Sequence, residues 1–264
     1  MDIATIAGLL LAFGALMVAV LIEGGKLGGF FNVSAGIIVI GGTLGAMVVC
    51  YPFKTILGMP GVLKQAFFAM EIDPLGMMKT VIQFARKARR EGILVLEEDA
   101  KRLNNEFLKT GIQLVVDGTP GELVREILET QVRSMEQRHQ TGEGMFSTLG
   151  GFAPTLGILG TVMGLVHMLA SLDEPGKMGP AIAAAFIATL YGVGTANLIF
   201  LPIASKLKAR SQAESLAYEL AIEGILSLQA GDNPRVVASK MASFLPPKLR
   251  AQFEQETAGG VGEG

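Results

Sequence analysis

Long stretches without a charged residue dominate the hydropathy pattern of the chain. Two such windows of 20 residues, 3–22 and 32–51, flank a short polar segment at 23–26. Two more, of 29 and 28 residues, cover 144–172 and 178–205. A helix rises about 1.5 Å per residue, so roughly 20 apolar residues cross the ~30 Å hydrocarbon layer of a bilayer. The pattern therefore predicts an all-α membrane protein with four transmembrane helices.

The windows and the charged segments between them divide the chain into four parts. The expected parts are a hairpin at 1–51 with spans 3–22 and 32–51, a helical insert at 52–143, a second hairpin at 144–205 with spans at about 148–172 and 178–203, and a helical tail at 206–264. The last two windows are longer than a bilayer requires, so their helices are expected to tilt or to project into the cytoplasm.

Capping residues place the first helices of the insert. Asp73 followed by Pro74 predicts a helix start, because aspartate caps well and proline is tolerated at the first helical position. This helix is expected to reach about Arg90 and to end at Gly92, with a second helix at about 93–109.

The rest of the charged sequence also has a helical pattern. Turn residues at 117–122 precede a helix with one apolar stripe, formed by Leu123, Ile127, Leu128, Val132 and Met135. After the fourth span the helix is expected to continue to about Ala230, followed by a short helix through Phe244. The glycine-rich end after Thr257 is expected to be disordered.

The distribution of basic residues predicts the orientation in the membrane. Of the 22 lysines and arginines, 13 lie in 52–143 and 7 follow Ser205, while each short hairpin loop holds only one, Lys26 or Lys177. Basic residues remain on the cytoplasmic side of a membrane protein. Both termini and the insert are therefore expected in the cytoplasm.

Composition excludes several other classes of protein. A net charge of −2 gives no basic field for a nucleic acid. A single cysteine, Cys50, excludes an internal disulfide and a cysteine-based zinc cluster. No phosphate-binding glycine loop, HExxH motif or nucleophile elbow is present, so an enzyme is not expected, and neither is a cofactor.

None of the four spans contains an aspartate or a glutamate. Ion pathways through membranes usually depend on an intramembrane carboxylate. If this protein conducts an ion, another chain must therefore supply the acidic group.

The third and fourth spans nevertheless carry polar residues that could line a pathway: Pro154, Thr155 and Thr161, then Thr189, Tyr191, Thr195 and Asn197. Pro154 and Thr161 are seven residues apart and so share one helix face. The proline frees the carbonyl of Gly150, which together with a hydroxyl could hold water or a small cation. The alternative is that the hydroxyls bond their own helix backbone and the proline only bends the helix.

Three further features of the spans have structural interpretations. His167, about one turn from the outer end, is read as an interfacial residue rather than a proton relay. The pairs Gly41–Gly45 and Gly160–Gly164 permit close helix approach.

Opposite charges gather in two adjoining segments of the insert. Arg86, Lys87, Arg89 and Arg90 precede Gly92, and Glu97, Glu98 and Asp99 follow it. They could form a solvated helix pair with weak ion pairs or a basic segment touching anionic lipid. They could also form a docking surface for a charged partner.

Five stretches, in order along nearly the whole chain, carry a resemblance to a known family: MDIATIAGLLLAFG, ARREGILVLEE, LVVDGT, GGFAPTLGILGTVMGLVHML and AFIATLYGVGTANLIFLPIASKL. They resemble the MotA/PomA family of flagellar stator subunits, within the MotA/TolQ/ExbB group. The resemblance implies a pentamer of this chain around a dimer of MotB/PomB-type subunits in the bacterial inner membrane, each partner bringing one transmembrane aspartate. It implies that ion flow through this complex turns the rotor.

The resemblance also implies roles for single residues. Rotor-binding charges that meet the protein FliG correspond to Arg89 and Glu97, beside Arg90 and Glu98, and the functional prolines correspond to Pro154 and Pro202. Sodium-driven members carry threonine at the position of Thr161, and Thr189 is the second of a threonine pair. The first member of that pair is Ala188 here. The transported ion is thus sodium or a proton, with sodium favoured and Thr161 and Thr189 as its oxygen ligands.

Two alternatives remain at this point. An ExbB/TolQ-type energiser of an outer-membrane system typically has three spans, and the hairpin at 3–51 argues against it. A membrane scaffold without ion flow would conduct nothing with any partner.

Overall fold

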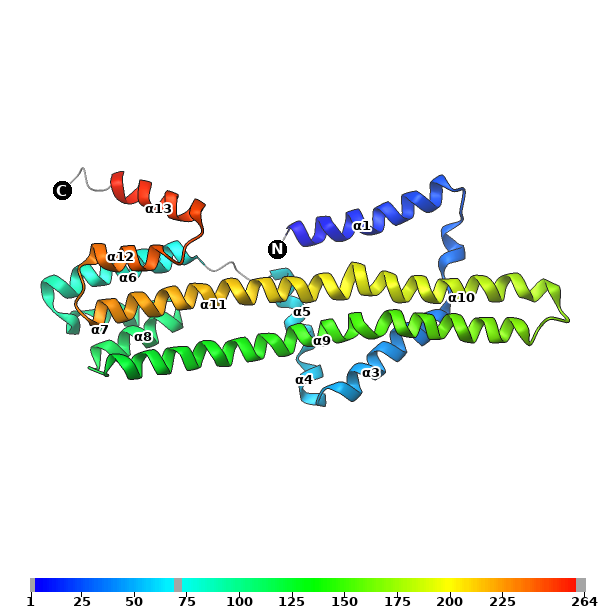
Figure 1. The fold of residues 1–264 in the computed structure, drawn as a ribbon, viewed down its shortest axis with the longest axis horizontal. Helices are drawn as coiled ribbons and strands as arrows, with labels where there is room; N and C mark the ends of the chain where they lie inside the picture. Colours follow the sequence, from blue (N-terminus) through cyan, green and yellow to red (C-terminus); the bar gives the residue numbers. More distant parts are fainter. Residues whose placement is uncertain (1–2, 69–72, 260–264) are drawn as a thin grey trace. The chain divides into compact units, whose positions relative to one another are not determined.

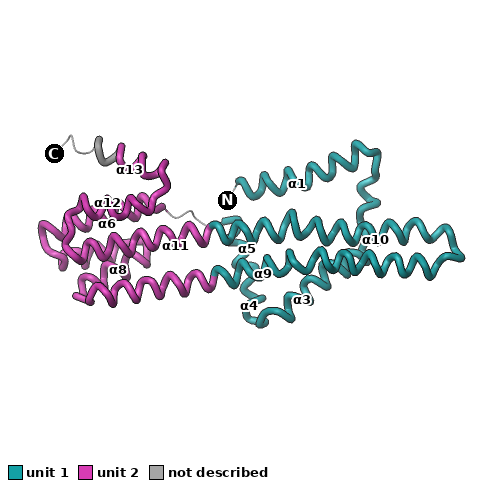
Figure 2. The backbone as a smooth tube through the Cα atoms, in the orientation of Figure 1, with its two compact units in different colours: residues 1–70, 139–209 teal, residues 71–138, 210–264 magenta. Residues whose placement is uncertain are grey.

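The computed structural model describes residues 3–68 and 73–259, and all regular elements within them are helices. The chain divides into two compact units (Figure 2). One, here called the membrane unit, comprises residues 1–70 and 139–209. The other, the charged unit, comprises residues 71–138 and 210–264.

The membrane unit contains the four predicted spans, which are confirmed as helices long and apolar enough to cross a bilayer. The first is α1 (Ile3–Ile22), which leads through η1 (Leu27–Phe30) into the second, and this consists of α2 (Val33–Gly36), η2 (Ile37–Gly41) and α3 (Gly42–Cys50). Two short helices follow, α4 (Phe53–Leu57) and α5 (Met59–Phe68). The third span lies within α9 (Gly121–Leu169), and the fourth comprises α10 (Pro175–Thr195), η4 (Ala196–Phe200) and the start of α11 (Leu201–Gln229) (Figure 1).

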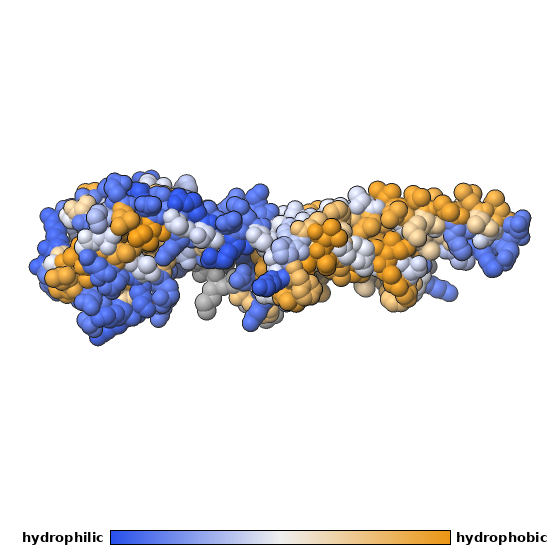
Figure 3. Space-filling model, turned by 90° about the horizontal axis from the view of Figure 1, so that it is seen from below, coloured by the Kyte–Doolittle hydropathy of each residue, from blue (hydrophilic) through white to orange (hydrophobic). Residues whose placement is uncertain are grey.

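Apolar side chains cover much of the surface of this unit (Figure 3). In the most apolar window of α1 no residue is buried, and in the other three spans 22% to 28% are buried. Surface of this kind requires lipid or other protein chains around it.

Two of the spans contain a turn of π-helix, one at η2 and one at η4. The second ends at Phe200, two residues before Pro202, which has no backbone N–H and whose ring would press on the carbonyl four residues earlier. The wider turn of a π-helix gives that carbonyl more room, which accounts for a π turn just before the proline.

The charged unit is a small helical domain with its own core. It contains α6 (Pro74–Glu91), η3 (Ile93–Val95), α7 (Leu96–Lys101), α8 (Glu106–Val116), α12 (Pro234–Ala242), α13 (Pro247–Gly259) and the parts of α9 and α11 that lie outside the membrane unit. Its fully buried side chains include Met78, Leu96, Ile112, Leu128, Ile225 and Met241.

Most helix boundaries of this unit agree with the sequence-based expectation. The carboxylate of Asp73 accepts a hydrogen bond from the Gly76 N–H (2.9 Å) and starts α6. Gly92, with φ of 89°, ends that helix in a conformation that favours glycine. The tail helix α11 ends at Gln229, just before Gly231 with φ of 73°.

The expectation of one helix at 93–109 was wrong. A short 3-10 turn, α7 and α8 replace it, with a break at 102–105. Asn105 has extended backbone angles, and its side chain accepts a hydrogen bond from the Leu108 N–H (3.0 Å), so it caps α8 as a new helix.

The C-terminal end of the chain was expected to be disordered after Thr257. The backbone of α13 is helical through Gly259, beyond the expected start of disorder at Thr257. Residues 260–264 lie outside the described residues.

Candidate functional site

Glycine and alanine bring α9 and α10 into close contact. A methyl group placed on Gly164 would lie 2.8 Å from the Cβ of Ala185, and one on Gly192 would lie 2.5 Å from the carbonyl oxygen of Ala153. Gly157 and Gly160 meet α10 in the same way. The predicted Gly160–Gly164 pair therefore packs within the chain. By contrast, Gly41 and Gly45 have no atom within 4 Å of such a methyl group.

Thr161 and Thr189 meet at this contact. Their hydroxyl oxygens are in direct hydrogen-bond contact, and both residues are half-buried. The Thr161 hydroxyl also lies 2.9 Å from the carbonyl oxygen of Ala185 and 3.1 Å from that of Gly157. Four oxygen atoms from two helices thus lie close together, in a part of the spans that contains no charged residue.

Pro154 and Thr155 lie about two turns before Thr161 on α9. Pro154 is half-buried and leaves the carbonyl of Gly150 without its usual donor. Thr155 is exposed, and its hydroxyl donates to the carbonyl of Phe152 on the same helix (2.7 Å). The same self-contained pattern holds for Thr195 and Asn197, which bond the carbonyls of Tyr191 (2.7 Å) and Val193 (2.9 Å).

Tyr191 has a different environment from the one the sequence suggested. Its hydroxyl donates to the carbonyl of Phe30 (2.6 Å) and accepts from the N–H of Asn32 (3.1 Å). Phe30 is the last residue of η1, and Asn32 is the N-cap of α2. The phenol therefore ties the first hairpin to α10, and Tyr191 contributes no free hydroxyl to a pathway.

A cavity of about 460 Å³ lies beside the threonine pair. Its wall includes Asn32 and Ser34 from the first hairpin, Gly164 and His167 from α9, and Ala185 from α10. His167 is exposed on this wall. No sequence pattern indicated the cavity, because its wall comes from three segments that are distant along the chain.

The charges around Gly92 are arranged differently from a simple arginine–glutamate pair. Lys87 on α6 binds Asp99 on α7 (2.6 Å), and this contact joins the two segments. Glu97 and Glu98 bind Lys101 at 2.9 and 3.3 Å. These two bonds, with that to Glu97 the larger effect, raise the pKa of Lys101.

Arg89 and Arg90 lie at the exposed end of α6. Among the described residues Arg90 has one ion-pair partner, its neighbour Glu91, at 3.7 Å. Within the described part of the chain Arg89 has no ion-pair partner, so its guanidinium is available to another molecule.

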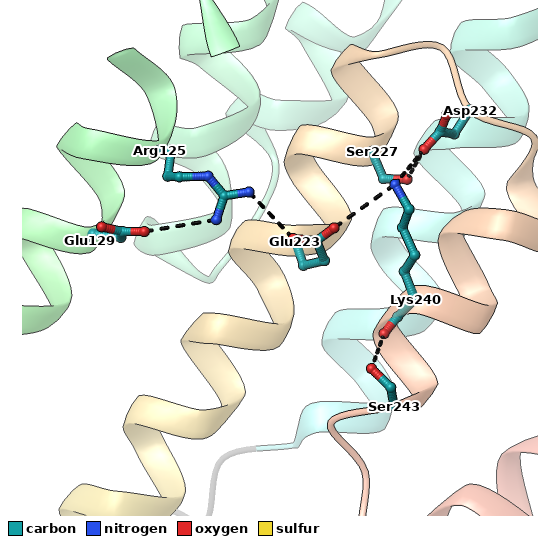
Figure 4. Close-up of polar contacts among 7 residues, drawn as sticks. All are labelled: Arg125, Glu129, Glu223, Ser227, Asp232, Lys240 and Ser243. Carbon is teal, nitrogen blue, oxygen red and sulfur yellow. Dashed lines mark hydrogen bonds and ion pairs between the residues drawn. The ribbon is translucent and has the colours of Figure 1, made fainter. Parts of the chain in front are cut away.

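A polar network in the charged unit was not predicted (Figure 4). Glu223 on α11 forms ion pairs with Arg125 from α9 (3.4 Å) and with Lys240 from α12 (3.9 Å). Lys240 also binds Asp232 (2.8 Å), which accepts from Ser227 (2.5 Å). The hydrogen bond from Lys240 first, and that from Ser227 second, lower the pKa of Asp232. Since Arg125 and Glu223 are 98 positions apart, no local pattern could reveal the network.

Over residues 3–68 and 73–259 no three histidine, cysteine or acidic side chains come together as a metal site.

Comparison with known proteins places the whole chain in one family. A sequence profile of the MotA/TolQ/ExbB proton channel family matches residues 99–220. Motility protein A of Bacillus subtilis (strain 168) is 38% identical over 266 residues, covering 100% of this chain and 98% of that protein. The chemotaxis protein PomA of Vibrio alginolyticus is 36% identical, covering 95% and 98%.

Solved structures agree with this result. The structure of the flagellar MotAB stator complex from Bacillus subtilis matches with a TM-score of 0.88 and 37% identity, over 95% of this chain and 99% of that one. The structure of C. jejuni MotAB matches with a TM-score of 0.88 and 31% identity, over 94% and 97%. The chain is therefore a MotA-type flagellar stator subunit and belongs to the MotA/PomA family, within the MotA/TolQ/ExbB group of channel proteins.

Proposed function

We propose that this chain and a MotB-type partner together form an ion channel that converts ion flow into torque on the flagellar rotor. Supporting this, the spans offer an oxygen cluster at Thr161 and Thr189 but contain no carboxylate of their own. The partner supplies the missing group as a transmembrane aspartate that faces Pro154. In this proposal five copies of the chain surround a dimer of that partner, and the similarity to MotAB complexes supports a mixed complex of the two kinds of subunit.

The proposed coupling ion is sodium. A sodium ion that sheds water needs oxygen ligands, and hydroxyl and carbonyl oxygens suit such hard cations. The observation that carries the proposal is the contact between Thr161 and Thr189 beside two backbone carbonyls. A proton would need no such shell, so in a proton-driven complex the same threonines would only pack.

The proposed orientation places both termini, the charged unit, α4 and α5 on the cytoplasmic side of the membrane. The support is the concentration of 13 basic residues in 52–143 and 7 after Ser205. The hairpin loops with Lys26 and Lys177 then face outward. Pro202, next to the π turn at η4, is the proposed point where the inner end of the fourth span changes shape.

The rotor-binding surface is proposed to comprise Arg89, Arg90, Glu97 and Glu98, with the rotor protein FliG as its partner. Arg89 and Arg90 are exposed and make no strong ion pair among the described residues. Glu97 and Glu98 are exposed as well but share Lys101. The basic half of the surface is therefore more accessible to an acidic partner than the acidic half is to a basic one.

The test is motility of cells that lack their own stators and receive this chain with its partner subunit. Swimming should be restored, and Arg89→Glu should reduce swimming speed several-fold while the complex still assembles in the membrane. A complementary reversal on the rotor should recover part of the speed. Unchanged torque in Arg89→Glu and Glu97→Lys, measured on tethered cells, would show that the rotor contact lies elsewhere.

A further inference from the structure

The helices α4 and α5 expose an unusual surface. Phe53, Leu57 and Phe68 are 68%, 66% and 53% exposed, and Lys54 and Lys64 lie exposed among them. We call these five residues the α4–α5 surface. The sequence from Tyr51 to Phe68 contains two lysines and no acidic residue.

The opposite side of the two helices is firmly packed. Ala66 is fully buried, and Ile56, Met59, Val62 and Phe67 pack on a core formed by Met145, Phe146, Leu149 and Ile203. A methyl group on Gly142 of α9 would lie 3.0 Å from Val62, so α5 sits close against that helix. The rotation of α4 and α5 is therefore fixed, and Phe53, Leu57 and Phe68 cannot turn inward.

An exposed helix face on a soluble surface would be polar, whereas this one combines large apolar side chains with lysine as its only charged residue type. Within the described residues neither Lys54 nor Lys64 has an ion-pair partner. A helix with apolar residues beside lysines is typical of segments that lie in the membrane interface. The long lysine stems can run along apolar surface while their ammonium groups reach the phosphates.

The position in the chain favours lipid over a second protein. The second span ends at Cys50, three residues before α4 begins at Phe53. The surface thus starts where the chain leaves the hydrocarbon layer, and Figure 1 shows α4 following directly on α3. We propose that α4 and α5 lie in the membrane interface, with Phe53, Leu57 and Phe68 at the acyl boundary and Lys54 and Lys64 binding anionic lipid headgroups. This proposal does not depend on the coupling ion, the partner subunit or the rotor.

The absence of tryptophan from the chain provides a clean spectroscopic test. Phe68→Trp places a single indole at the C-terminal end of α5, which is the end farther along the chain from the second span. The full chain is reconstituted into vesicles of phosphatidylcholine with a minority of phosphatidylglycerol. In one preparation the phosphatidylglycerol is brominated, and in the other an equal mole fraction of phosphatidylcholine is brominated, since bromine quenches indole fluorescence on contact.

We expect quenching by both lipids, and roughly two- to fivefold stronger quenching by brominated phosphatidylglycerol. The reason is that the electrostatic attraction between one lysine and an anionic membrane surface corresponds to a factor of about five in binding. Lys54→Gln/Lys64→Gln should remove the preference, Lys54→Arg/Lys64→Arg should retain it, and added salt should weaken it. Lys177→Gln, which removes one positive charge at the start of α10, is the matched control and should leave it unchanged.

Two results would overturn the proposal. No quenching by either lipid would mean that water or protein covers α5. Equal quenching by both lipids, unaffected by the lysine substitutions, would mean apolar contact without recognition of anionic headgroups. Circular dichroism establishes that each variant is folded, and Phe53→Trp is the second reporter if Phe68→Trp does not fold.

Discussion

Thr161 has more oxygen neighbours than a threonine bonded to its own helix requires. Its hydroxyl lies near the carbonyls of Gly157 and Ala185 and the hydroxyl of Thr189, but it has one proton to donate. Thr155, by comparison, has the single acceptor Phe152 on its own helix. The two threonines look equivalent in sequence, and only the contact between α9 and α10 separates a candidate ligand from a self-contained side chain.

This difference predicts unequal effects of the same substitution. Thr161→Val keeps the branched shape but removes the oxygen, and it should raise the external sodium needed for half-maximal swimming speed roughly tenfold or more, as expected for a lost polar contact to a charged group. Thr155→Val is the control and should change this sodium concentration little. Speed is measured at constant pH and ionic strength. Full speed of the unsubstituted motor without sodium, slowed only by a proton uncoupler, would show that protons drive it.

At the scale of elements, the register between α9 and α10 places the two threonines together. That register is set where backbones touch, at Gly157, Gly164 and Gly192. Small residues in the spans indicated close packing in general. Which glycine meets which helix depends on the rotation of both helices, and residues 24 to 28 positions apart form the hydroxyl contacts.

Two neighbouring glycines of α10 should respond differently to the same methyl group. In Gly192→Ala the new methyl would lie 2.5 Å from the Ala153 carbonyl and 2.9 Å from the Cα of Gly157, so the helices must separate. We expect a loss of roughly 1–3 kcal/mol in stability and impaired motility. Gly194→Ala meets nothing within 4 Å and should be neutral or slightly stabilising. Thermal unfolding in detergent distinguishes the two, and equal midpoints would contradict the packing described.

The network around Glu223 predicts a pH dependence for the attachment of α12. The pKa of Asp232 lies below its ordinary 3.8, mainly because of the bond from Lys240, and the bond to Asp232 raises the pKa of Lys240 above 10.5. The stabilisation is therefore complete between these two values. It is lost as pH falls through the lowered pKa of Asp232 or rises through the raised pKa of Lys240.

Lys240→Met should therefore be slightly less stable than the original chain at neutral pH, and the difference should shrink below about pH 3.8 and above about pH 10.5. Lys248→Met removes an exposed lysine without an ion pair among the described residues and serves as the control. Thermal unfolding followed by circular dichroism across this range is the measurement. A difference that stays constant over the whole range would show that Lys240 acts by packing alone.

At the scale of the whole molecule, sequence was most informative where one physical factor dominates. Windows without charge predicted four membrane helices, since few other structures tolerate such stretches. It was least informative where side chains from distant segments meet. The tie from Tyr191 to Phe30, the bond from Lys87 to Asp99 and the split of 93–109 at the Asn105 cap all depend on packing that no local pattern encodes. The residue types of the candidate site could be predicted, but their contacts could not.

Ion flux into vesicles tests the central claim most directly, because the claim assigns oxygen ligands to this chain and the acidic group to its partner. Vesicles with the chain alone, with the chain and its MotB-type partner, and with a partner whose membrane aspartate is replaced by asparagine are compared under a sodium gradient and under a proton gradient. We predict flux only from the complex with the intact aspartate. Gradient-driven flux through the chain alone, or through the asparagine complex at the full rate, would contradict the account.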